Sequence, residues 1–488
     1  MASTDATKNP DPFAFHFEEI RIGGSGSTGD VNVTGNIAEI ELYENINELA
    51  IHGTMTMIDN DGIVARLDIQ GAEYVKVRAI IPDSPGFPFV KRFRISKILN
   101  TSKASDNVEA YTFQLVDEDS YVNTLQNVSR AYTGDISQII ENILIDYFPD
   151  KPQNPLMVGP KPVQKVLKYV VPNITPYQAI KVLKNRATGP AGTPFYAFST
   201  LADSKVRFFD LKELLDYEAL NLTGKERSYI FSVAHTNLMG AVGTDTVEDA
   251  QERSYSISRF EVRETEDMLS LINNGDIGAN YEYINTTGGY VDEYHHDAAV
   301  MFENVWQKTK TQKPLAPIFD PVANVGKKFL SDYRSINISQ VAASNIFDDV
   351  PSLNEDLTDV IHRSKSVGKA LRNFLRKSAV HIEVPGRNFF PFNKEYSMTI
   401  SNKIDIQVLA NRDIKKDDDT EDILDQKKSG RYIILASRHS FNAVSKKYTC
   451  TLKLGKLGNV RGNTRINRVG YGMGQIDPAL ARAAGMEF

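Results

Sequence analysis

The densest group of potential metal ligands in the sequence is the run Glu293-Tyr294-His295-His296-Asp297. Imidazole and carboxylate groups are suitable ligands for a divalent transition metal. The run lies in a predicted strand, where neighbouring residues point to opposite faces, so His295 and His296 cannot both reach one ion without a bend. An open metal site also needs three or four ligands that converge on one point. We therefore expect no metal site at this run.

Signatures of other kinds of catalytic site are missing from the sequence. Glycoside hydrolysis needs two carboxylates about 5 to 10 Å apart in a cleft, and no pair stands out among the 62 Asp and Glu residues. The chain contains no G-x-S-x-G, H-E-x-x-H or G-x-x-x-x-G-K-[ST] motif. Cys450 alternates with two threonines in a predicted strand, which is typical of a buried, inert thiol. The sequence thus predicts no catalytic residue, no cofactor and no metal, and so no enzyme.

Length, charge and cysteine content narrow the class of protein. A chain of 488 residues predicts two to four domains and excludes a single compact barrel. The formal net charge of -6 offers no counter-charge for a phosphate backbone, so we expect no sequence-specific binding of nucleic acid. The single cysteine excludes an internal disulfide framework. No apolar stretch approaches the roughly 18 residues of a membrane span, and residues 1–12 do not resemble a secretory signal.

The hydrophobic pattern predicts a mainly β chain with an α+β middle part. Polar and apolar residues alternate, as in half-buried strands, in the segments 37–43, 49–58, 75–80, 93–98 and 110–116. We expect these strands to form a small barrel or curled sheet. Apolar stripes or capping signals predict helices at 135–148, 175–187, 266–273 and 367–377. Aromatic strands at 195–199 and 206–209 lie between helices, and strands return at 255–295 and 379–454.

The two β-rich ends of the chain repeat the same series of short sequences in the same order. The first series comprises 71–77, 93–98 and 111–115, and the second comprises 394–400, 432–437 and 448–452. This alignment places Tyr74 with Tyr396 and Phe93 with Tyr432. The longer second copy has room for the acidic insertion 411–428, which a hairpin tip tolerates at little entropic cost. Chance similarity between hairpins is the alternative, because strand patterns are degenerate, but we favour a duplication.

Two charged segments lie near the C-terminal end. Seven acidic residues fall between Asp413 and Asp425, so this insertion is either solvated or meets a basic partner. From Lys446 to Ile476 there are seven basic residues and no acidic one. The tail is either solvated or docked on a partner, and Gly-Asn-Arg segments that become ordered at interfaces favour docking.

Several short sequences together carry a resemblance to a known family. They are Leu49–Asp59 followed by Asp61-Gly62, Ile174–Ile180 followed by Phe195–Phe198 and Phe208–Asp210, and Leu371–Lys377 followed by Val380–Gly386. In this order and spacing, the chain resembles the central baseplate hub proteins of T4-like contractile-tailed phages, which are related to the N-terminal hub region of VgrG spikes. The resemblance runs from about Phe13 to Gly458.

The resemblance implies an α+β, mainly β fold with two tail-tube-like β-barrel domains and inserted α+β domains, discontinuous in sequence. On this template the first tube-like domain is 13–117 and the second is 255–295 with 360–458. A peripheral α+β domain takes in 118–254 and 296–359, and 459–488 is a C-terminal extension. The insertion 411–428 and the tail 459–488 depart from the family pattern, so the resemblance says nothing of their contacts.

The implied function is that of a virion structural protein in the tail baseplate, assembled in the host cytoplasm and used in viral genome ejection. Three chains would form a homotrimeric ring with pseudo-sixfold symmetry, a symmetry adapter between the tail tube and the threefold central spike. The implied partners are the spike protein, the tail tube or tube-initiator protein and the baseplate wedge proteins. A tail-associated hydrolase or a glycan-binding tail component remains the alternative, with the activity in the middle α+β domain.

Overall fold

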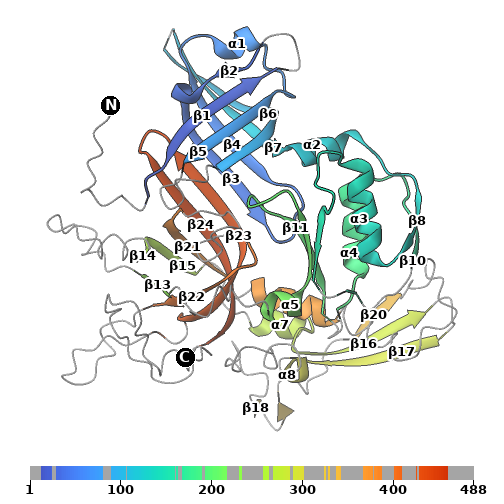
Figure 1. The fold of residues 1–488 in the computed structure, drawn as a ribbon. Coiled ribbons are helices and arrows are strands. Elements are labelled where there is room, and N and C mark those ends of the chain that lie inside the picture. Colours follow the sequence, from blue (N-terminus) through green and yellow to red (C-terminus); the bar gives the residue numbers. More distant parts are fainter. Residues whose placement is uncertain are drawn as a thin grey trace, which may run out of the picture.

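The computed structural model shows a mainly β chain with one large sheet and several smaller units beside it (Figure 1). The structure describes residues 13–24, 29–80, 89–105, 107–159, 161–162, 167–189, 193–216, 230–233, 256–262, 268–285, 290–301, 324–325, 328–329, 337–341, 366–376, 379–386, 400–408, 425 and 428–459. In this part of the chain, no helix is long and apolar enough to cross a membrane.

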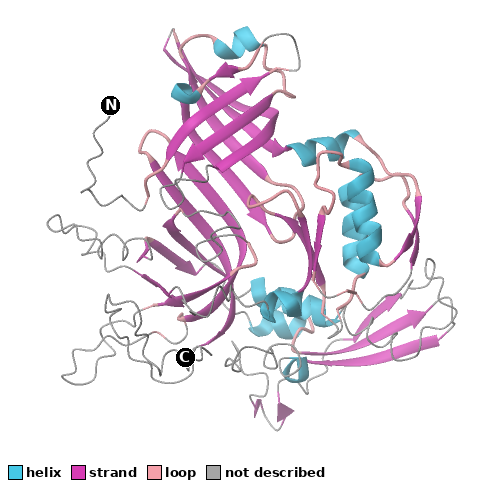
Figure 2. Ribbon diagram, viewed as in Figure 1, coloured by secondary structure: helices cyan, strands magenta, loops and turns pink. Residues whose placement is uncertain are grey.

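The large sheet has 14 strands and joins the two β-rich ends of the chain (Figure 2). Its N-terminal strands are β1 (His16–Gly23), β2 (Val31–Asn32), β3 (Ile37–Asn45), β4 (His52–Asp59), β5 (Tyr74–Ile80), β6 (Phe89–Ser105) and β7 (Val108–Asp117). We call these seven strands the first module. The second module comprises β13 (Ile230–Val233), β14 (Ser256–Ile257), β15 (Arg259–Val262), β21 (Ala379–Pro385), β22 (Lys403–Gln407), β23 (Gly430–Asn442) and β24 (Lys447–Asn459).

The two modules have the same strand order. In the first, the order across the sheet is β2-β1-β5-β6-β7-β4-β3, and in the second it is β14-β13-β22-β23-β24-β21-β15. The strands correspond one to one in their order along the chain as well. The four pairings from β5 to β3 and the four from β22 to β15 are all antiparallel. The modules differ at β13, which is parallel to β22 and β14 although β1 is antiparallel to β5 and β2.

The central hairpins of the two modules also agree in register. Phe93 of β6 pairs with Asp117 of β7, and Tyr432 of β23 pairs with Lys456 of β24. Each hairpin then has a register shift at the corresponding place, between Ile95 and Lys97 in one and between Ile434 and Ala436 in the other. Bulges at matching positions are specific features of a strand pair, so these registers confirm the sequence repeat at the level of strand order.

One detail of the predicted repeat is wrong. Strand β22 pairs with β23 in the same way as β5 pairs with β6. In this correspondence Tyr74 matches Lys403. The sequence alignment had placed Tyr74 with Tyr396, and residues 394–399 lie outside the described residues. Alternating strand patterns can be shifted without losing their match, which explains the error. The acidic insertion 411–428 falls in the connection between β22 and β23, and within it the structure describes only Asp425 and Lys428.

An α+β unit packs beside the first module (Figure 1). It contains α2 (Glu118–Leu125), α3 (Ile136–Tyr147), α4 (Pro176–Arg186) and α5 (Leu211–Asp216), with β8 (Ala131–Gly134), β9 (Leu156–Val158), β10 (Leu167–Val170), β11 (Phe195–Ser199) and β12 (Val206–Asp210). The order β11-β12-β9 makes a small sheet. Thr175 and Gln178 form the predicted capping box of α4, and Asp135 and Gln138 form one at α3. These two predicted helices are therefore confirmed.

The remaining elements lie below the α+β unit in Figure 1. They are α7 (Met268–Asn273), β16 (Gly278–Asn285), β17 (Tyr290–Asp297), α8 (Ala298–Met301), β18 (Asn324–Val325), β19 (Lys328–Phe329) and β20 (Asn337–Val341), with a helix over 366–376. Strands β17, β16 and β20 form a sheet of their own. In the first module, α1 (Ile63–Leu67) and a 3-10 turn, η1 (Thr34–Asn36), complete the described elements.

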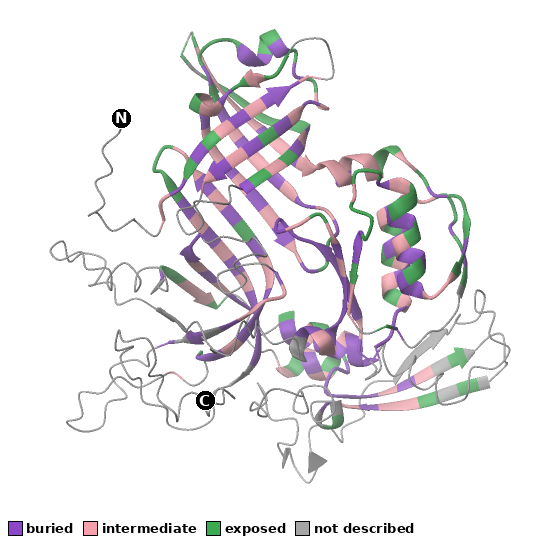
Figure 3. Cartoon of the chain, viewed as in Figure 1, coloured by how far each residue is buried: buried purple, intermediate pink, exposed green. Residues whose placement is uncertain are grey.

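Buried side chains of the described residues form two large hydrophobic cores and a small cluster at Ala279 and Tyr281 (Figure 3). The larger core is continuous through both modules and includes the helix over 366–376 and Phe198 and Leu201 from the α+β unit. The smaller core lies between α3, α4 and the sheet of β11. The predicted mainly β class is thus confirmed. The described strands close no sheet into a barrel, so the barrel prediction is not confirmed.

Helix α3 offers a matched pair of isoleucines with which to test the smaller core. Ile140 is fully buried in that core, whereas Ile145 on the same helix is 51% exposed. We expect Ile140→Ala to lower the free energy of unfolding by about 2 to 5 kcal/mol, because it removes buried methyl groups and leaves a cavity. Ile145→Ala should change it by less than about 0.5 kcal/mol. Urea denaturation measures both, and equal effects would contradict the packing described.

Candidate interface between the two modules

The structure places the histidines of the predicted run on opposite faces of β17. The ring of His295 lies 3.2 Å from the side-chain oxygen of Asn280 on β16, measured from Nδ1. His296 is fully buried, and its Nε2 donates to the backbone oxygen of Asp276 over 2.9 Å. Burial lowers the pKa of His296, which favours the neutral ring. No group of three or more potential ligands able to hold a metal occurs in the described residues.

The feature that organises the large sheet is the direct pairing of β3 with β23. Strand β3 runs antiparallel to the second half of β23, from Asn45 opposite Ala436 to Glu39 opposite Asn442. The first half of β23, up to Ile433, pairs with β22 instead. The backbone N–H of Ile46 extends the contact by donating to Leu435 over 2.9 Å. We call this shared edge the intermodule joint; it lies at the centre of the sheet in Figure 1.

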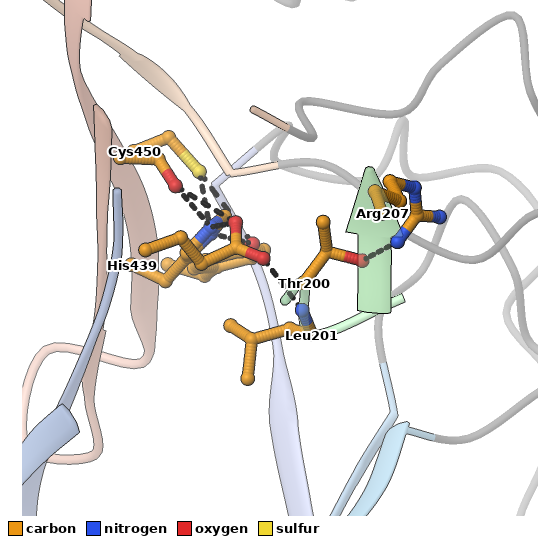
Figure 4. Close-up of polar contacts among 8 residues, drawn as sticks. Thr200, Leu201, Arg207, His439 and Cys450 are labelled. Carbon is orange, nitrogen blue, oxygen red and sulfur yellow. Dashed lines mark hydrogen bonds and ion pairs between the residues drawn. The ribbon is translucent and has the colours of Figure 1, made fainter. Parts of the chain in front are cut away.

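A buried ion pair lies beneath the intermodule joint (Figure 4). Glu44 of β3 and His439 of β23 have no exposed side-chain surface, and Glu44 Oε2 lies 3.2 Å from His439 Nε2. Ser437 donates its hydroxyl to the same carboxylate oxygen over 2.9 Å. On the other side of the ring, His439 Nδ1 lies 2.8 Å from the hydroxyl of Tyr448 on β24. Each polar atom at the centre of the pair therefore has a partner, as burial requires.

The ion pair also contacts the α+β unit. The other carboxylate oxygen of Glu44 accepts a hydrogen bond of 2.5 Å from the backbone N–H of Leu201. Leu201 follows Thr200, the first residue after β11. The Thr200 hydroxyl accepts a hydrogen bond of 2.7 Å from Arg207 on β12 (Figure 4). Arg207 also pairs with Asp203 at 2.9 Å. Glu44 thus connects three units: the first module, the second module and the α+β unit.

The electrostatics favour the charged form of both partners. Burial by itself would raise the pKa of Glu44, but the hydrogen bonds and charge of His439, the Leu201 N–H and the Ser437 hydroxyl outweigh it, and the pKa is lowered. Burial would lower the pKa of His439, but the neighbouring Cys450 and Glu44 outweigh it, and the pKa is raised. A paired imidazolium and carboxylate result. Such a pair adds little net stability, yet it strongly disfavours arrangements that separate the two charges.

Cys450 is buried, as the sequence predicts, but it is not surrounded by apolar groups alone. Its sulfur lies 3.1 Å from His439 Nδ1 and 3.5 Å from the Tyr448 hydroxyl. Cysteine, histidine and glutamate in this series are the components of a nucleophilic triad. Cys450, His439 and Glu44 are all inaccessible to solvent, however, so no substrate reaches the thiol. The series is a packing arrangement of the joint.

A polar pocket of about 320 Å³ lies between the first module and the α+β unit. Lys151 crosses it, with its Nζ 2.7 Å from Asp119 and 2.9 Å from the backbone oxygen of Ser204. Lys91 of β6 donates to the backbone oxygen of Asp203 over 3.3 Å. Burial raises the pKa of Asp117, the N-cap of α2, to about 7. The contacts of Lys151 therefore hold parts of the α+β unit together, and the contact of Lys91 joins β6 to that unit.

Sequence reasoning missed Glu44, Ser437 and His439. A signal for them exists in the strand pattern, because Glu44 shares a face with Ile40 and Leu42, and His439 shares a face with Phe441. A charged residue on the apolar face of a strand needs a partner. The partner of Glu44 is 395 positions away in the chain, so the sequence alone gives no means of pairing the two residues.

We expect His439→Gln to destabilise the protein strongly. The substitution removes the cation and leaves the Glu44 carboxylate buried without an opposite charge, which costs about 3 to 5 kcal/mol. The double variant Glu44→Gln, His439→Gln should recover part of this loss, because no buried charge remains. His52→Gln is the matched control, since the ring of His52 is 43% exposed and 3.8 Å from Glu48. Thermal unfolding at fixed protein concentration measures the wild type and the three variants, and equal effects of the two single histidine substitutions would contradict a buried pair.

The ion pair also predicts a pH dependence with a defined sign. The raised pKa of His439 contributes stability that is fully present below its ordinary value of 6.5 and is lost as the pH rises towards about 10. The lowered pKa of Glu44 contributes stability that is present above its ordinary value of 4.5 and is lost as the pH falls through the folded-state pKa. The difference in melting temperature between the wild type and His439→Gln should therefore be larger at pH 6 than at pH 10. A difference that grows with pH would show that His439 is neutral.

No family model and no curated protein matches the sequence. Among solved structures, a tail protein from Neisseria meningitidis is similar at 11% identity with a TM-score of 0.49, over 91% of this chain and 96% of that one. The 43 kDa tail protein of prophage MuSo2 from Shewanella oneidensis is similar at 9% identity with a TM-score of 0.47, over 90% and 98%.

A further similar structure is an E. coli component of the type VI secretion system, which is described as structurally similar to the T4 tail proteins gp27 and gp5. It is 8% identical with a TM-score of 0.40, over 91% of this chain and 79% of that one. These three similar structures are two tail proteins, one of them from a prophage, and a type VI secretion component.

Proposed function

We propose that this chain is the structural baseplate hub of a contractile phage tail, and that it acts without enzyme activity. The observation that carries the proposal is the pair of modules with one strand order, joined edge to edge in a single sheet. Two similar modules in one chain are what a symmetry adapter needs. Three copies arranged head to tail in a closed ring present six similar modules around the axis while the ring itself has threefold symmetry.

The ring gives the protein its partners in this proposal. The six similar modules match a sixfold tail tube or tube-initiator protein on one side. The threefold arrangement of the whole chains matches the central spike protein on the other. The α+β unit packs beside the first module, and in the proposed ring it meets the baseplate wedge proteins. The location is accordingly the virion tail baseplate, and genome ejection passes through the ring.

The domains proposed from the sequence take small changes from the strand pairing. The first tube-like domain stays at 13–117. The second takes in β13 at 230–233, which pairs with β22, in addition to 255–262 and 360–458. Strand β16 pairs with both β17 and β20, so we place 268–295 with the peripheral α+β domain formed by 118–229 and 296–359. Residues 459–488 remain a C-terminal extension.

The buried pair Glu44 and His439 supports a structural role for the intermodule joint. An enzyme keeps its reacting groups within reach of a substrate. Here the histidine and the thiol are used to fix three units of the chain in one arrangement. Rigid placement of the two modules is a requirement for a ring, because a small error in the angle between them is repeated three times around the axis.

The oligomeric state tests the proposal. We expect the purified protein to have three times the 54.5 kDa mass of one chain in light scattering coupled to size exclusion. An obligate ring interface should bury more than about 2,000 Å² per contact, so the trimer should persist at micromolar concentration. A protein that stays monomeric, alone and when mixed with its spike, would rule out the ring.

A further inference from the structure

Among the described strands, the first module has an edge without a partner strand, at the position where the second module forms the intermodule joint. The first half of β6, from Phe89 to Arg94, pairs with β5, as the first half of β23 pairs with β22. The second half of β23 then pairs with β3. From Lys97 to Ser105, β6 pairs with β7 on one side, and no strand in the described part of the chain pairs with it on the other.

The side chains along this half of β6 are accessible. Apart from Ile98, which is half-buried, the residues described between Ser96 and Ser105 are exposed, and Leu99 is 45% exposed. The segment has two lysines and no acidic residue. Lysines on a strand edge discourage pairing with an identical edge, but they allow pairing with a different strand that has acidic residues.

The strand that corresponds to β3 in the second module is β15. In the first module, Leu42 of β3 lies opposite Gly53 of β4, which lies opposite Leu115 of β7. In the second, Val262 of β15 lies opposite Val380 of β21, which lies opposite Leu454 of β24. Leu115 and Leu454 hold the same place in the two hairpins, because they pair with Ile95 and Ile434. Val262 therefore takes the place of Leu42.

We propose that β15 of one copy pairs antiparallel with Lys97–Ser105 of β6 in the next copy, and that this second joint closes the ring. The inference rests on the proposed function and names its partner surface. Within one chain β3 joins the second module to the first, and between chains β15 joins the second module of one copy to the first module of another. Each module then contributes two strands to such joints: β3 and β6 in the first module, and β15 and β23 in the second. A ring of six modules built from three chains needs this arrangement.

The internal joint also gives the register of the proposed one. Leu42 lies opposite His439, and His439 lies opposite Cys450 in the hairpin of β23 and β24. Cys450 comes four residues before Leu454, and Tyr111 comes four residues before Leu115, so Tyr111 takes the place of Cys450. Thr101 lies opposite Tyr111, beyond an additional register shift of β6 near Leu99, and therefore takes the place of His439. Val262 of one copy should therefore lie opposite Thr101 of the next. Directly opposed Cα atoms in an antiparallel pair lie about 4.5 to 5.5 Å apart, which is within the range of Cα distances that a disulfide spans.

Cysteine cross-linking tests this pairing in the full chain. Val262 is 42% exposed and Thr101 is exposed, while the native Cys450 is inaccessible and stays in place. After mild oxidation with oxidised glutathione, Val262→Cys combined with Thr101→Cys should give covalently linked trimers on a non-reducing gel. The matched control combines Val262→Cys with Val90→Cys, because Val90 is 41% exposed but lies in the half of β6 that β5 already covers. This control should give no cross-link above that of the single-cysteine variants.

The outcomes separate the two proposals. Cross-linked trimers that depend on both cysteines support the β15 to β6 joint. If light scattering shows a trimer but Val262→Cys forms no cross-link with cysteine at Asn100, Thr101 or Ser102, the joint is overturned and the proposed hub stands. If the Val90 pair links as efficiently as the Thr101 pair, the register is overturned in the same way. If the wild-type protein forms no trimer, the hub and the joint both fall.

Discussion

The antiparallel pairing of β3 with β23 is the constraint on which the rest of the structure depends. It brings together residues such as Glu39 and Asn442 from nearly opposite ends of the chain and makes one sheet of two modules. Strand pairing fixes the spacing at about 4.8 Å and limits the twist between neighbours. The two modules therefore have one relative orientation, and every larger assembly of this chain inherits it.

The ion pair beneath the joint explains why the strands meet in this register and no other. A slip of one residue would turn Glu44 to the opposite face of β3, away from His439 and the Leu201 N–H. The carboxylate would lose three hydrogen bonds, and the imidazolium would stay buried without its partner. An apolar pair in the same place would tolerate such a slip more easily, so the charges contribute specificity more than net stability.

The sequence predicts local features of this fold well and long-range ones poorly. Helices α3 and α4 are found from their stripe and capping signals, and the strands of the first module are found from their alternation, because each signal lies within one element. The alignment of Tyr74 with Tyr396 fails because a two-residue period matches itself at many offsets. Glu44 and His439 stay undetected because each needs the other to be recognised, and the chain separates them by 395 positions.

The differences between the modules are as informative as their likeness. The strands that carry the joints, β3, β6, β15 and β23, have corresponding partners and directions in both modules. Strand β13 runs opposite to its counterpart β1, and the connection from β22 to β23 is longer than that from β5 to β6. In the ring that we propose, the joint-bearing strands repeat six times, whereas these outer features repeat three times. A threefold partner would distinguish one module from the next by contacting the outer features. A sixfold partner would contact only the strands that both modules share.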